Sequence, residues 1–330
     1  MGRVLSVSME RTATLPAAML NTALRYFLEV VDSGSLTVAA QNLHVAPSAV
    51  SRMVRKLEEE HQTLLFDRHA RGMVLTEAGQ LLKAYARRAS LEAERARAEI
   101  RDLNQVGQKL IRISANQAFG RELLPRVIGE FRAIEPSLRF DLNILQSSEI
   151  NRRVREGEDD IGMSYNLSPP QGVHVQYARR MPVIAVMAPD HPLASRKTLS
   201  MRDIGDHPVA LMGPGSTIRF IIDLCCMHEK IELNVAMTCN NQGAIENSCL
   251  RWGAISFSGD LTVMTSTERG ELIKIPMSNP ELHQRNMHIQ TMAGRHLPSS
   301  VTRFVEALSA HIDAAYADPA WMADRLDTAR

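Results

Sequence analysis

Apolar and polar positions follow a helical period between residues 20 and 60 of the chain, whereas residues 1–18 show no sustained period. Apolar residues recur at steps of three and four over residues 20–32, and a shorter run of the same kind covers residues 36–43. Gly34 lies in the break between these two runs, and Pro47 suits the first turn of a third helix. Residues 35–60 are therefore predicted to form two short helices joined by a tight turn.

The third predicted helix has two chemically different faces. At 100° per residue an apolar side forms from four residues: Val50, Met53, Val54 and Leu57. The opposite side carries short hydroxyls and charges: Ser48, Arg52, Arg55 and Glu59, with Ser51 on its flank. Such a helix can pack on a domain through one side and offer donors to DNA phosphates and base edges through the other. The alternative is an ordinary surface helix with a solvated polar face.

Two short apolar runs follow this helix and predict a β-hairpin. They cover residues 64–66 and 73–75, and they flank a polar tip that contains Gly72. A hairpin after a helix-turn-helix is the wing of a winged helix. Arg68, His69 and Arg71 at its tip would then lie beside a phosphate backbone, the alternative being a solvated hairpin tip.

A long helix is predicted after the hairpin, opening at Thr76 and Glu77. A narrow apolar stripe starts at Ala78 and recurs over seven turns, and its members are Leu82, Tyr85, Ala89, Ala93, Ala96, Ile100 and Leu103. The other positions carry charges of both signs, as on a coiled-coil helix. We expect a homodimer through this helix. The alternative is that the stripe packs on its own chain.

From Lys109 the pattern changes to strands alternating with helices. Strands are expected at 110–113, 138–145, 160–163, 183–187, 209–211, 235–238, 254–257 and 287–291. Helices are expected at 123–133, 149–155, 218–228, 244–251 and 301–314. This order predicts an α/β fold with parallel sheets. Two similar series, one of them interrupted, indicate two lobes with a cleft between them.

The positive and negative charges of the chain are nearly balanced, so DNA binding would depend on the positions of the charges and not on their number. The net charge of the 330 residues is +1, so no bulk basic character points to nucleic acid. The sequence contains no run of 18 apolar residues, so neither a membrane span nor a membrane partner is expected. Polar residues interrupt the N-terminal stretch, so a secretory signal is not expected either. We therefore expect a cytoplasmic protein. Its four cysteines would then be buried thiols rather than disulfides.

The N-terminal pattern resembles that of the LysR-type transcriptional regulators. The resemblance is carried by residues in the order and spacing of that family: Phe27, Gly34, Ser35, Leu36, Ala39, Ala40, Leu43, Ser48, Ala49, Val50, Ser51, Leu57, Glu58, Leu65, Phe66, Arg68, Leu75, Thr76, Ala78 and Gly79. It continues weakly along the second half, for example at Leu124–Pro125 and through residues 189–194. Two departures are His61–Gln62 before the wing and Trp252 near the expected cleft.

The resemblance implies a domain order. It comprises a flexible arm (1–18), a winged helix-turn-helix domain (19–76, motif about 35–54), a dimerising linker helix (77–106), a two-lobed effector-binding domain like periplasmic binding proteins (109–314) and a tail (315–330). Lobe I would hold about 110–180 and 280–312, and lobe II 181–279. The family implies tetramers that bind operator DNA and alter transcription when a small molecule enters the cleft, with RNA polymerase as a further partner.

The resemblance also assigns DNA contacts. The positions matching the family's contacts are Pro47, Ser48, Ser51 and Arg52 on the helix and Arg68 and Arg71 in the wing, and the polar helix face adds Arg55. A guanidinium can bridge guanine O6 and N7 or bind a phosphate, which makes Arg52 our choice for a base or phosphate contact.

Residues that follow strands or open helices are the candidates for effector binding. They are Asn116, Gln117, Ser147, Ser216, Thr217 and Asn240. Helix N-termini with hydroxyl or amide side chains favour an anionic ligand such as a carboxylate. The alternative for each residue is a plain helix cap without a ligand.

Motifs for other function classes are absent from the sequence. The second half has no GxSxG, GxGxxG, Walker loop or HExxH, so neither an enzyme nor a cofactor is expected. Cys225 and Cys226 point about 100° apart on one helix, without a second ligand cluster, which favours packing over a metal site. A repressor that needs no ligand, or one that senses redox state through Cys239 and Cys249, remains open as an alternative.

Overall fold

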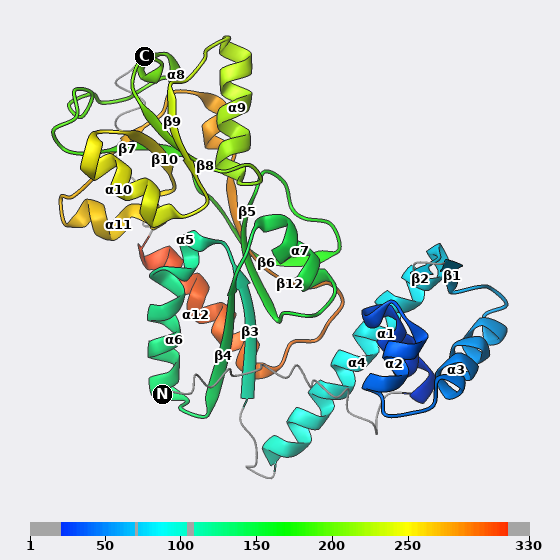
Figure 1. Cartoon of the computed structure of the whole chain (residues 1–330). Helices are drawn as coiled ribbons and strands as arrows, with labels where there is room; N and C mark the ends of the chain where they lie inside the picture. Colours follow the sequence, from blue (N-terminus) through cyan, green and yellow to red (C-terminus); the bar gives the residue numbers. More distant parts are fainter. Residues whose placement is uncertain (1–20, 70–71, 104–108, 316–330) are drawn as a thin grey trace, which may run out of the picture. The chain divides into compact units, whose positions relative to one another are not determined.

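The chain forms two compact units, residues 1–106 and 107–330. The computed structural model describes residues 21–69, 72–103 and 109–315 (Figure 1). The expected arm at 1–18, the tail beyond residue 315 and Arg71 lie outside the described residues. The side chains of Arg68, Ile100 and Leu103 are also outside the description.

Three helices make the body of the first unit: α1 (Thr22–Ser33), α2 (Leu36–Asn42) and α3 (Pro47–Glu60). Gly34 ends α1 in the left-handed region at φ 64°, where a glycine carries no Cβ penalty. Ser35 then caps α2 by accepting a hydrogen bond from the Val38 amide. Phe27 lies at the centre of the core with no exposed surface, and truncating such a phenylalanine costs about 3–5 kcal/mol.

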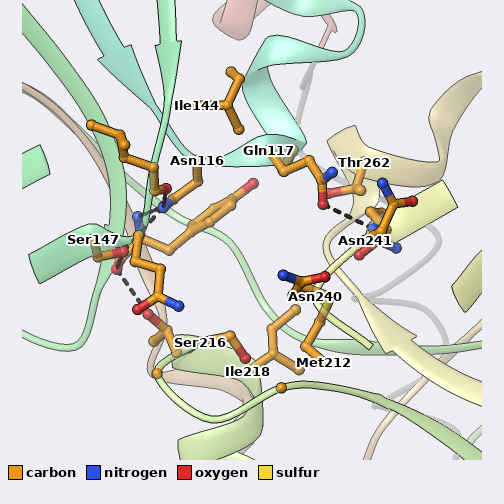
Figure 2. A pocket seen from close by; sticks show the side chains of 18 of the residues that line it. Asn116, Gln117, Ile144, Ser147, Met212, Ser216, Ile218, Asn240, Asn241 and Thr262 are labelled. Carbon is orange, nitrogen blue, oxygen red and sulfur yellow. Dashed lines mark hydrogen bonds between the residues drawn. The ribbon is translucent and has the colours of Figure 1, made fainter. Parts of the chain in front are cut away.

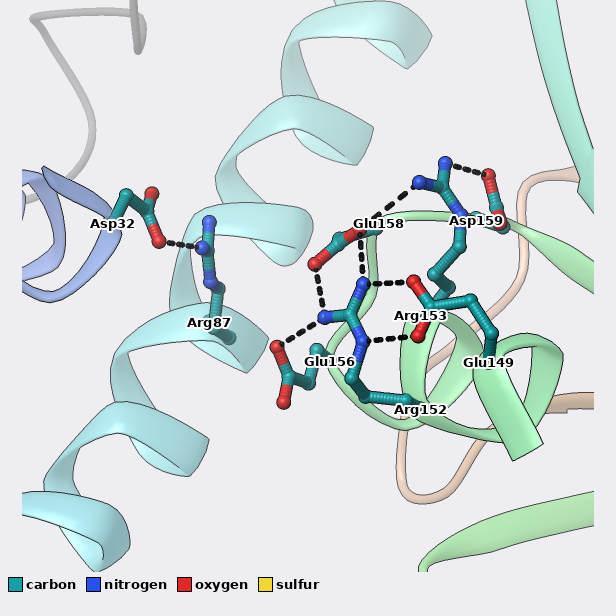
Figure 3. Close-up of polar contacts among 8 residues, drawn as sticks. All are labelled: Asp32, Arg87, Glu149, Arg152, Arg153, Glu156, Glu158 and Asp159. Carbon is teal, nitrogen blue, oxygen red and sulfur yellow. Dashed lines mark hydrogen bonds and ion pairs between the residues drawn. The ribbon is translucent and has the colours of Figure 1, made fainter.

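A two-stranded hairpin and a long helix complete the first unit. Strands β1 (Phe66–His69) and β2 (Gly72–Leu75) pair antiparallel, as the predicted wing requires. Helix α4 (Glu77–Leu103) packs closely on the segment that leads into β1, because a Cβ on Gly79 would come within 2.1 Å of the Leu65 carbonyl oxygen. An ion pair between Arg87 and Asp32 holds α4 to the end of α1 (Figure 3).

Two five-stranded sheets form the second unit. Lobe I has the strand order β4-β3-β5-β12-β6, with β3 (Lys109–Ala115), β4 (Leu138–Ile144), β5 (Ile161–Asn166), β6 (Val173–Arg180) and β12 (Asn286–Met292). Lobe II has the order β11-β7-β10-β8-β9, with β7 (Ile184–Met187), β8 (Val209–Met212), β9 (Val235–Cys239), β10 (Ile255–Ser258) and β11 (Ile273–Pro276).

The expectation of parallel sheets was wrong for part of each lobe. Strands β3, β4 and β5 are parallel, as are β8, β9 and β10. By contrast, β12 runs antiparallel to β5 and β6, and β7 runs antiparallel to β10 and β11. The antiparallel strands β7 and β12 each enter a sheet directly after the chain crosses between lobes. A strand that arrives from the cleft side runs against strands that end there, so both sheets are mixed.

Helices cover both sheets. Those of lobe I are α5 (Gln117–Gly120), α6 (Leu123–Ile134), α7 (Ser147–Arg155) and α12 (Ser299–Ala315); the second series comprises α8 (Met201–Ile204), α9 (Thr217–Glu229), α10 (Gln242–Trp252), α11 (Asp260–Glu268) and the 3-10 turn η1 (Pro280–His283). The sequence did not predict β6, β11, α5, α8, α11 or η1. Helix α11 was missed because its buried residues, Leu261, Thr262, Val263 and Ser266, follow no amphipathic period.

Two crossover segments join the lobes and hydrogen-bond to each other. The Met181 amide donates to the Arg285 carbonyl at 2.8 Å, and the Val183 amide donates to the Leu282 carbonyl at 2.8 Å. The Arg285 side chain adds a bond from Nε to the Met181 carbonyl at 3.0 Å. These paired segments form the hinge of the second unit.

A dense ion-pair network stabilises the end of α7 (Figure 3). Arg152 bonds Glu149, Glu156 and Glu158, and Arg153 bonds the buried Asp159 at 2.5 Å. The hydrogen bond from Arg152 lowers the pKa of Glu149. Cations in the last turn also favour the helix dipole, so this network fixes the helix whose first turn reaches the cleft.

Candidate functional site

Helix α3 presents its two faces as the sequence predicts. Val50 and Val54 have no exposed surface and Leu57 has 3%, so the apolar side is packed in the unit's core. Arg52 and Arg55 are exposed, whereas Ser51 is half-buried on the flank. Pro47 and Ser48 are exposed at the start of the helix, where no side chain caps the first turn. Pro47 has no amide hydrogen and the Ala49 amide bonds the Ala46 carbonyl at 2.9 Å, so the amide that this turn offers to a phosphate is that of Ser48.

The path from α3 into the wing is fixed by Glu58, a residue whose role the sequence did not indicate. Its carboxylate accepts a hydrogen bond from the Leu65 amide at 3.0 Å. Gln62 takes a left-handed conformation at φ 51° in the same turn. The departure at His61–Gln62 is therefore accommodated, and the chain still enters a regular hairpin. His69 is exposed on this hairpin.

Some residues of the apolar stripe along α4 are buried in the core of the first unit, and others are exposed. Ala78 and Leu82 pack against the core of the first unit, and Ala86 is fully buried in it. Tyr85 is 54% exposed, and Leu81, outside the predicted stripe, is 72% exposed. Three further members of the stripe are half-buried: Ala89, Ala93 and Ala96. Own-chain packing thus accounts for Ala78 and Leu82, while an apolar surface at Leu81 and Tyr85 remains.

A pocket of about 560 Å³ lies between the lobes of the second unit (Figure 2). It is lined by all six candidate effector residues: Asn116, Gln117, Ser147, Ser216, Thr217 and Asn240. The sequence did not indicate several other lining residues, among them Ile144, Gln146, Tyr165, Met212, Ile218, Asn241, Gln242, Thr262 and Arg285. The first turns of α7, α9 and α10 all reach this pocket.

Asn116 and Ser147 join three segments of lobe I at the pocket wall. The Asn116 side-chain Oδ1 accepts from the Tyr165 amide at 2.8 Å and from the Ser147 hydroxyl at 3.1 Å. Its Nδ2 donates to the Leu145 carbonyl at 3.1 Å. Ser147 also donates to the Tyr165 carbonyl at 2.9 Å. The side chain of Asn116 is thus engaged in holding strand ends together.

Two candidate residues bridge the lobes. Gln117 of lobe I accepts a hydrogen bond through Oε1 from the Gln242 amide, at the N-terminus of α10, at 2.8 Å. Thr217 of lobe II donates to the Tyr165 carbonyl of lobe I at 2.9 Å. Beyond the pocket, Arg121 pairs with the buried Glu246 at 2.6 Å. The lobes are therefore held closed around the pocket by direct bonds.

Ser216 and Asn241 cap helices that open at the pocket. The Ser216 hydroxyl accepts from the Arg219 amide at 3.1 Å, and the Asn241 side chain accepts from the Ala244 amide at 3.0 Å. Asn240 beside them is exposed. Trp252, expected near the cleft, is 45% exposed at the far end of α10 and does not line the pocket. That expectation was wrong because the tryptophan ends the helix whose beginning faces the cleft.

One side chain with a full charge lines the pocket among the described residues: Arg285, only 1% exposed. Its guanidinium carbon lies 4.0 Å from the centroid of the Tyr165 ring, a cation–π distance. Burial raises the pKa of Tyr165, although Arg285 and Thr262 act to lower it. The phenol is therefore neutral at physiological pH, and its hydroxyl oxygen is buried.

Two family models together match most of the chain. The model for bacterial regulatory helix-turn-helix proteins of the lysR family matches residues 22–80, and the LysR substrate binding domain model matches residues 104–313. The chain is a LysR-type transcriptional regulator. It is accordingly a DNA-binding regulator with a small-molecule effector domain, and not an enzyme.

Relatives of this LysR-type regulator extend over most of its length. It is 30% identical over 236 residues to a probable RuBisCO transcriptional regulator of Cyanidioschyzon merolae, covering 70% of this chain and 78% of the relative. It is 28% identical over 297 residues to the Escherichia coli regulator YeiE, covering 90% and 96%. It is 23% identical over 291 residues to the activator CmpR of Synechocystis, covering 87% and 94%.

Solved structures share the fold of this LysR-type regulator. Full-length OxyR from Pseudomonas aeruginosa matches with a TM-score of 0.62 at 21% identity, over 90% of this chain and 96% of that one. The Synechocystis CcmR regulatory domain, solved in complex with 2-PG, matches with a TM-score of 0.53 at 20% identity, over 62% and 97%. The OxyR match supports the order of a helix-turn-helix unit and a two-lobed unit, and the CcmR match supports the fold of the two-lobed unit.

Burial raises the pKa of Cys225 and of Cys249 to about 12. No group of three His, Cys, Asp or Glu side chains within residues 21–69, 72–103 and 109–315 is arranged to hold a metal ion. No helix among the described residues is long and apolar enough to span a membrane.

Proposed function

We propose that this regulator binds operator DNA as a homo-oligomer and changes its transcriptional output when a small anionic effector enters the cleft. The observation that carries the proposal is the polar pocket of about 560 Å³ between two lobes that are bridged by hydrogen bonds. A ligand in this pocket would contact both lobes. It could therefore change their relative geometry, which is what a sensor requires.

The anionic character of the effector is supported by the pocket's polarity. Helices α7, α9 and α10 open at the pocket, and helix N-termini favour negative charge. The described lining residues include no Asp or Glu. The similar CcmR domain was solved with 2-PG bound. We propose a small carboxylate or phosphate-bearing metabolite, bound by Gln117, Ser147, Ser216, Thr217 and Asn240.

DNA recognition is proposed through the exposed side of α3, with the wing beside it. Pro47, Ser48, Ser51, Arg52 and Arg55 would lie in a major groove while Val50 and Val54 anchor the helix. Arg68 and Arg71 of the wing would bind phosphates. A homodimer formed through α4 would place two such helices on paired half-sites, about one DNA turn apart. Tetramers and contact with RNA polymerase are part of the same proposal, as is a cytoplasmic location.

The test of DNA recognition is a gel-shift titration with operator fragments found by genome-wide binding-site mapping. Arg52→Ala should weaken binding roughly tenfold to hundredfold, because a bidentate contact contributes about 1–3 kcal/mol. Arg88→Ala, on the exposed surface of α4, is the matched control and should bind as the parent does. Equal binding by Arg52→Ala and the parent would remove Arg52 from the contact.

The test of effector sensing uses the genes beside the mapped sites. Metabolites handled by their products are added to the operator complex, and the footprint and promoter output are measured. A metabolite that changes either readout supports sensing. No response to any of them would favour the alternative of a ligand-independent repressor.

A further inference from the structure

A buried carboxylate of lobe II bonds to lobe I outside the pocket. The side chain of Glu246, on α10, is only 6% exposed. Its Oε1 lies 2.6 Å from Nη1 of Arg121, the residue that follows α5 in lobe I. The side-chain Nε2 of Gln242 and the hydroxyl of Ser266, both in lobe II, lie 3.5 Å from the same carboxylate. The shorter bond to this buried charge therefore comes from the opposite lobe.

The segment around Arg121 makes two further bonds to lobe II. Gln117 accepts through Oε1 from the main-chain amide of Gln242 at 2.8 Å. The Glu122 carboxylate accepts a hydrogen bond from the hydroxyl of Thr265, on α11. One short segment of lobe I is therefore bonded to both α10 and α11.

Pocket residues and interlobe bonds lie on the same helix faces. In each of the three elements at this junction, a residue that lines the pocket precedes a residue of an interlobe bond by three or four positions. Residues at that spacing are neighbours on one face of a helix. The three pairs are Gln117 and Arg121, Gln242 and Glu246, and Thr262 and Thr265. A displacement of the interlobe bonds is therefore transmitted to the pocket wall.

Gly120 provides a second link between this segment and the pocket. A Cβ on Gly120 would lie 2.2 Å from Cδ1 of Ile144, a residue that lines the pocket. Helix α5 therefore packs directly on a side chain of the pocket wall. Movement of α5 and movement of that wall are coupled within lobe I as well.

The two members of the ion pair differ in their access to water. The Arg121 side chain is 39% exposed and already reaches water, whereas the Glu246 side chain is buried. Removing the partner of a buried charge is strongly destabilising, because the charge is left without compensation. An open cleft would let water reach the carboxylate. Loss of Arg121 should therefore favour opening more than loss of the charge on Glu246.

We propose that Arg121 and Glu246 form a latch that keeps the cleft closed in the absence of a ligand. The latch acts on the pocket through the paired residues of α5, α10 and α11, so its strength sets how often the cleft opens. That strength depends on one charge in each lobe. This inference rests on the proposed function and names the regulation of its cleft.

The main-chain amide of Gln242 reports the opening of the cleft. Gln242 is the first residue of α10, where a backbone amide has no partner within the helix. Its hydrogen bond is to Gln117 of the other lobe, so its exchange with deuterium reports separation of the lobes. The Val183 amide bonds the Leu282 carbonyl in the hinge and is the internal control for loss of the fold.

The experiment measures hydrogen–deuterium exchange of the full-length protein without added ligand, resolved to single amides by mass spectrometry. Arg121→Gln should raise the exchange rate of the Gln242 amide about tenfold, the effect of breaking an ion pair with one buried and one partly exposed partner. The Val183 rate should stay as in the parent. Glu246→Gln should raise the Gln242 rate only about threefold, because it leaves no buried charge.

A double variant separates the latch from a general loss of packing. Arg121→Gln combined with Glu246→Gln removes the uncompensated charge, so the Gln242 amide should exchange more slowly than in Arg121→Gln alone. Two independent losses of packing would add instead. Arg303→Gln is the matched control, since it removes an ion pair with Glu135 within lobe I and should leave Gln242 exchange unchanged.

Three results would overturn the inference. They are an unchanged Gln242 rate in Arg121→Gln, a double variant that exchanges as fast as Arg121→Gln or faster, and an equal rise in Arg303→Gln. If Arg121→Gln does not fold, which a raised Val183 rate would reveal, Glu246→Gln decides, because it keeps the shape of the side chain. A raised Gln242 rate with an unchanged Val183 rate then supports the latch, and an unchanged Gln242 rate contradicts it.

Failure of the latch is distinguishable from failure of the proposed function. The exchange experiment contains neither operator nor effector, so its outcome does not depend on them. If a metabolite alters the operator footprint but Arg121→Gln leaves Gln242 exchange unchanged, effector sensing stands and only the latch is removed. If the exchange rates change as expected but no metabolite alters the footprint, the proposed sensing fails and the latch remains a property of the fold.

Discussion

Asn116 shows how a residue in the cleft can be structural. Its side chain makes three hydrogen bonds that join the ends of β3, β4 and β5. We predict that Asn116→Ala lowers the free energy of unfolding of the second unit by about 1–3 kcal/mol, because buried partners lose their bonds. Urea unfolding followed by circular dichroism measures this. Asn240→Ala, with an exposed side chain, is the control, and equal stability of both variants would contradict the prediction.

The buried cysteines lead to a second prediction about individual residues. With the pKa of Cys225 and Cys249 raised to about 12, both remain neutral thiols until the pH approaches that value, and a thiol reacts through its thiolate. We predict that native protein at pH 8 is alkylated at these two positions only after denaturation, as mass spectrometry would show. Operator binding should be insensitive to peroxide. Loss of binding on mild oxidation would revive the redox-responsive alternative.

At the scale of secondary-structure elements, helix α4 leads to a prediction about the oligomeric state. Leu81 and Tyr85 are one turn apart and are 72% and 54% exposed, so they offer the apolar surface a partner helix would cover. We predict that Leu81→Glu shifts the oligomer toward monomer, because burying a carboxylate opposes association. Analytical ultracentrifugation measures the shift. Gln80→Glu adds the same charge at a neighbouring exposed position and should not dissociate the oligomer; equal dissociation would argue against the surface.

The two units give the prediction at the scale of the whole molecule. Strand β12 lies between β5 and β6 in lobe I, although lobe II separates it from them in sequence. We predict that residues 1–106 and 107–330 fold as separate fragments, whereas residues 107–276 do not, because lobe I would lose an inner strand and α12. Circular dichroism and proton NMR distinguish these outcomes. A cooperative unfolding transition of the 107–276 fragment would contradict the prediction.

Local pattern alone determined the first unit. The apolar stripe of α3, the break at Gly34 and the polar hairpin tip each lie within a short stretch of the sequence. The sequence also predicted six residues that line the pocket, because strand ends and helix caps can be recognised from the local sequence. The local sequence did not predict that the Asn116 side chain would form hydrogen bonds between the ends of three strands.

Tertiary structure decided what depends on residues distant in sequence. Strand β6 alternates half-buried and exposed positions, but β12, which pairs with it, follows a hundred residues later, and the antiparallel direction of β12 depends on that return. Tyr165 and Arg285 are separated by the whole of lobe II, and only the crossover brings the ring onto the guanidinium. Hydrophobic periodicity reports which face of an element is buried and not against what it is buried. The family could therefore be predicted from the sequence, while the packing of Arg285 on the Tyr165 ring in the pocket wall could not.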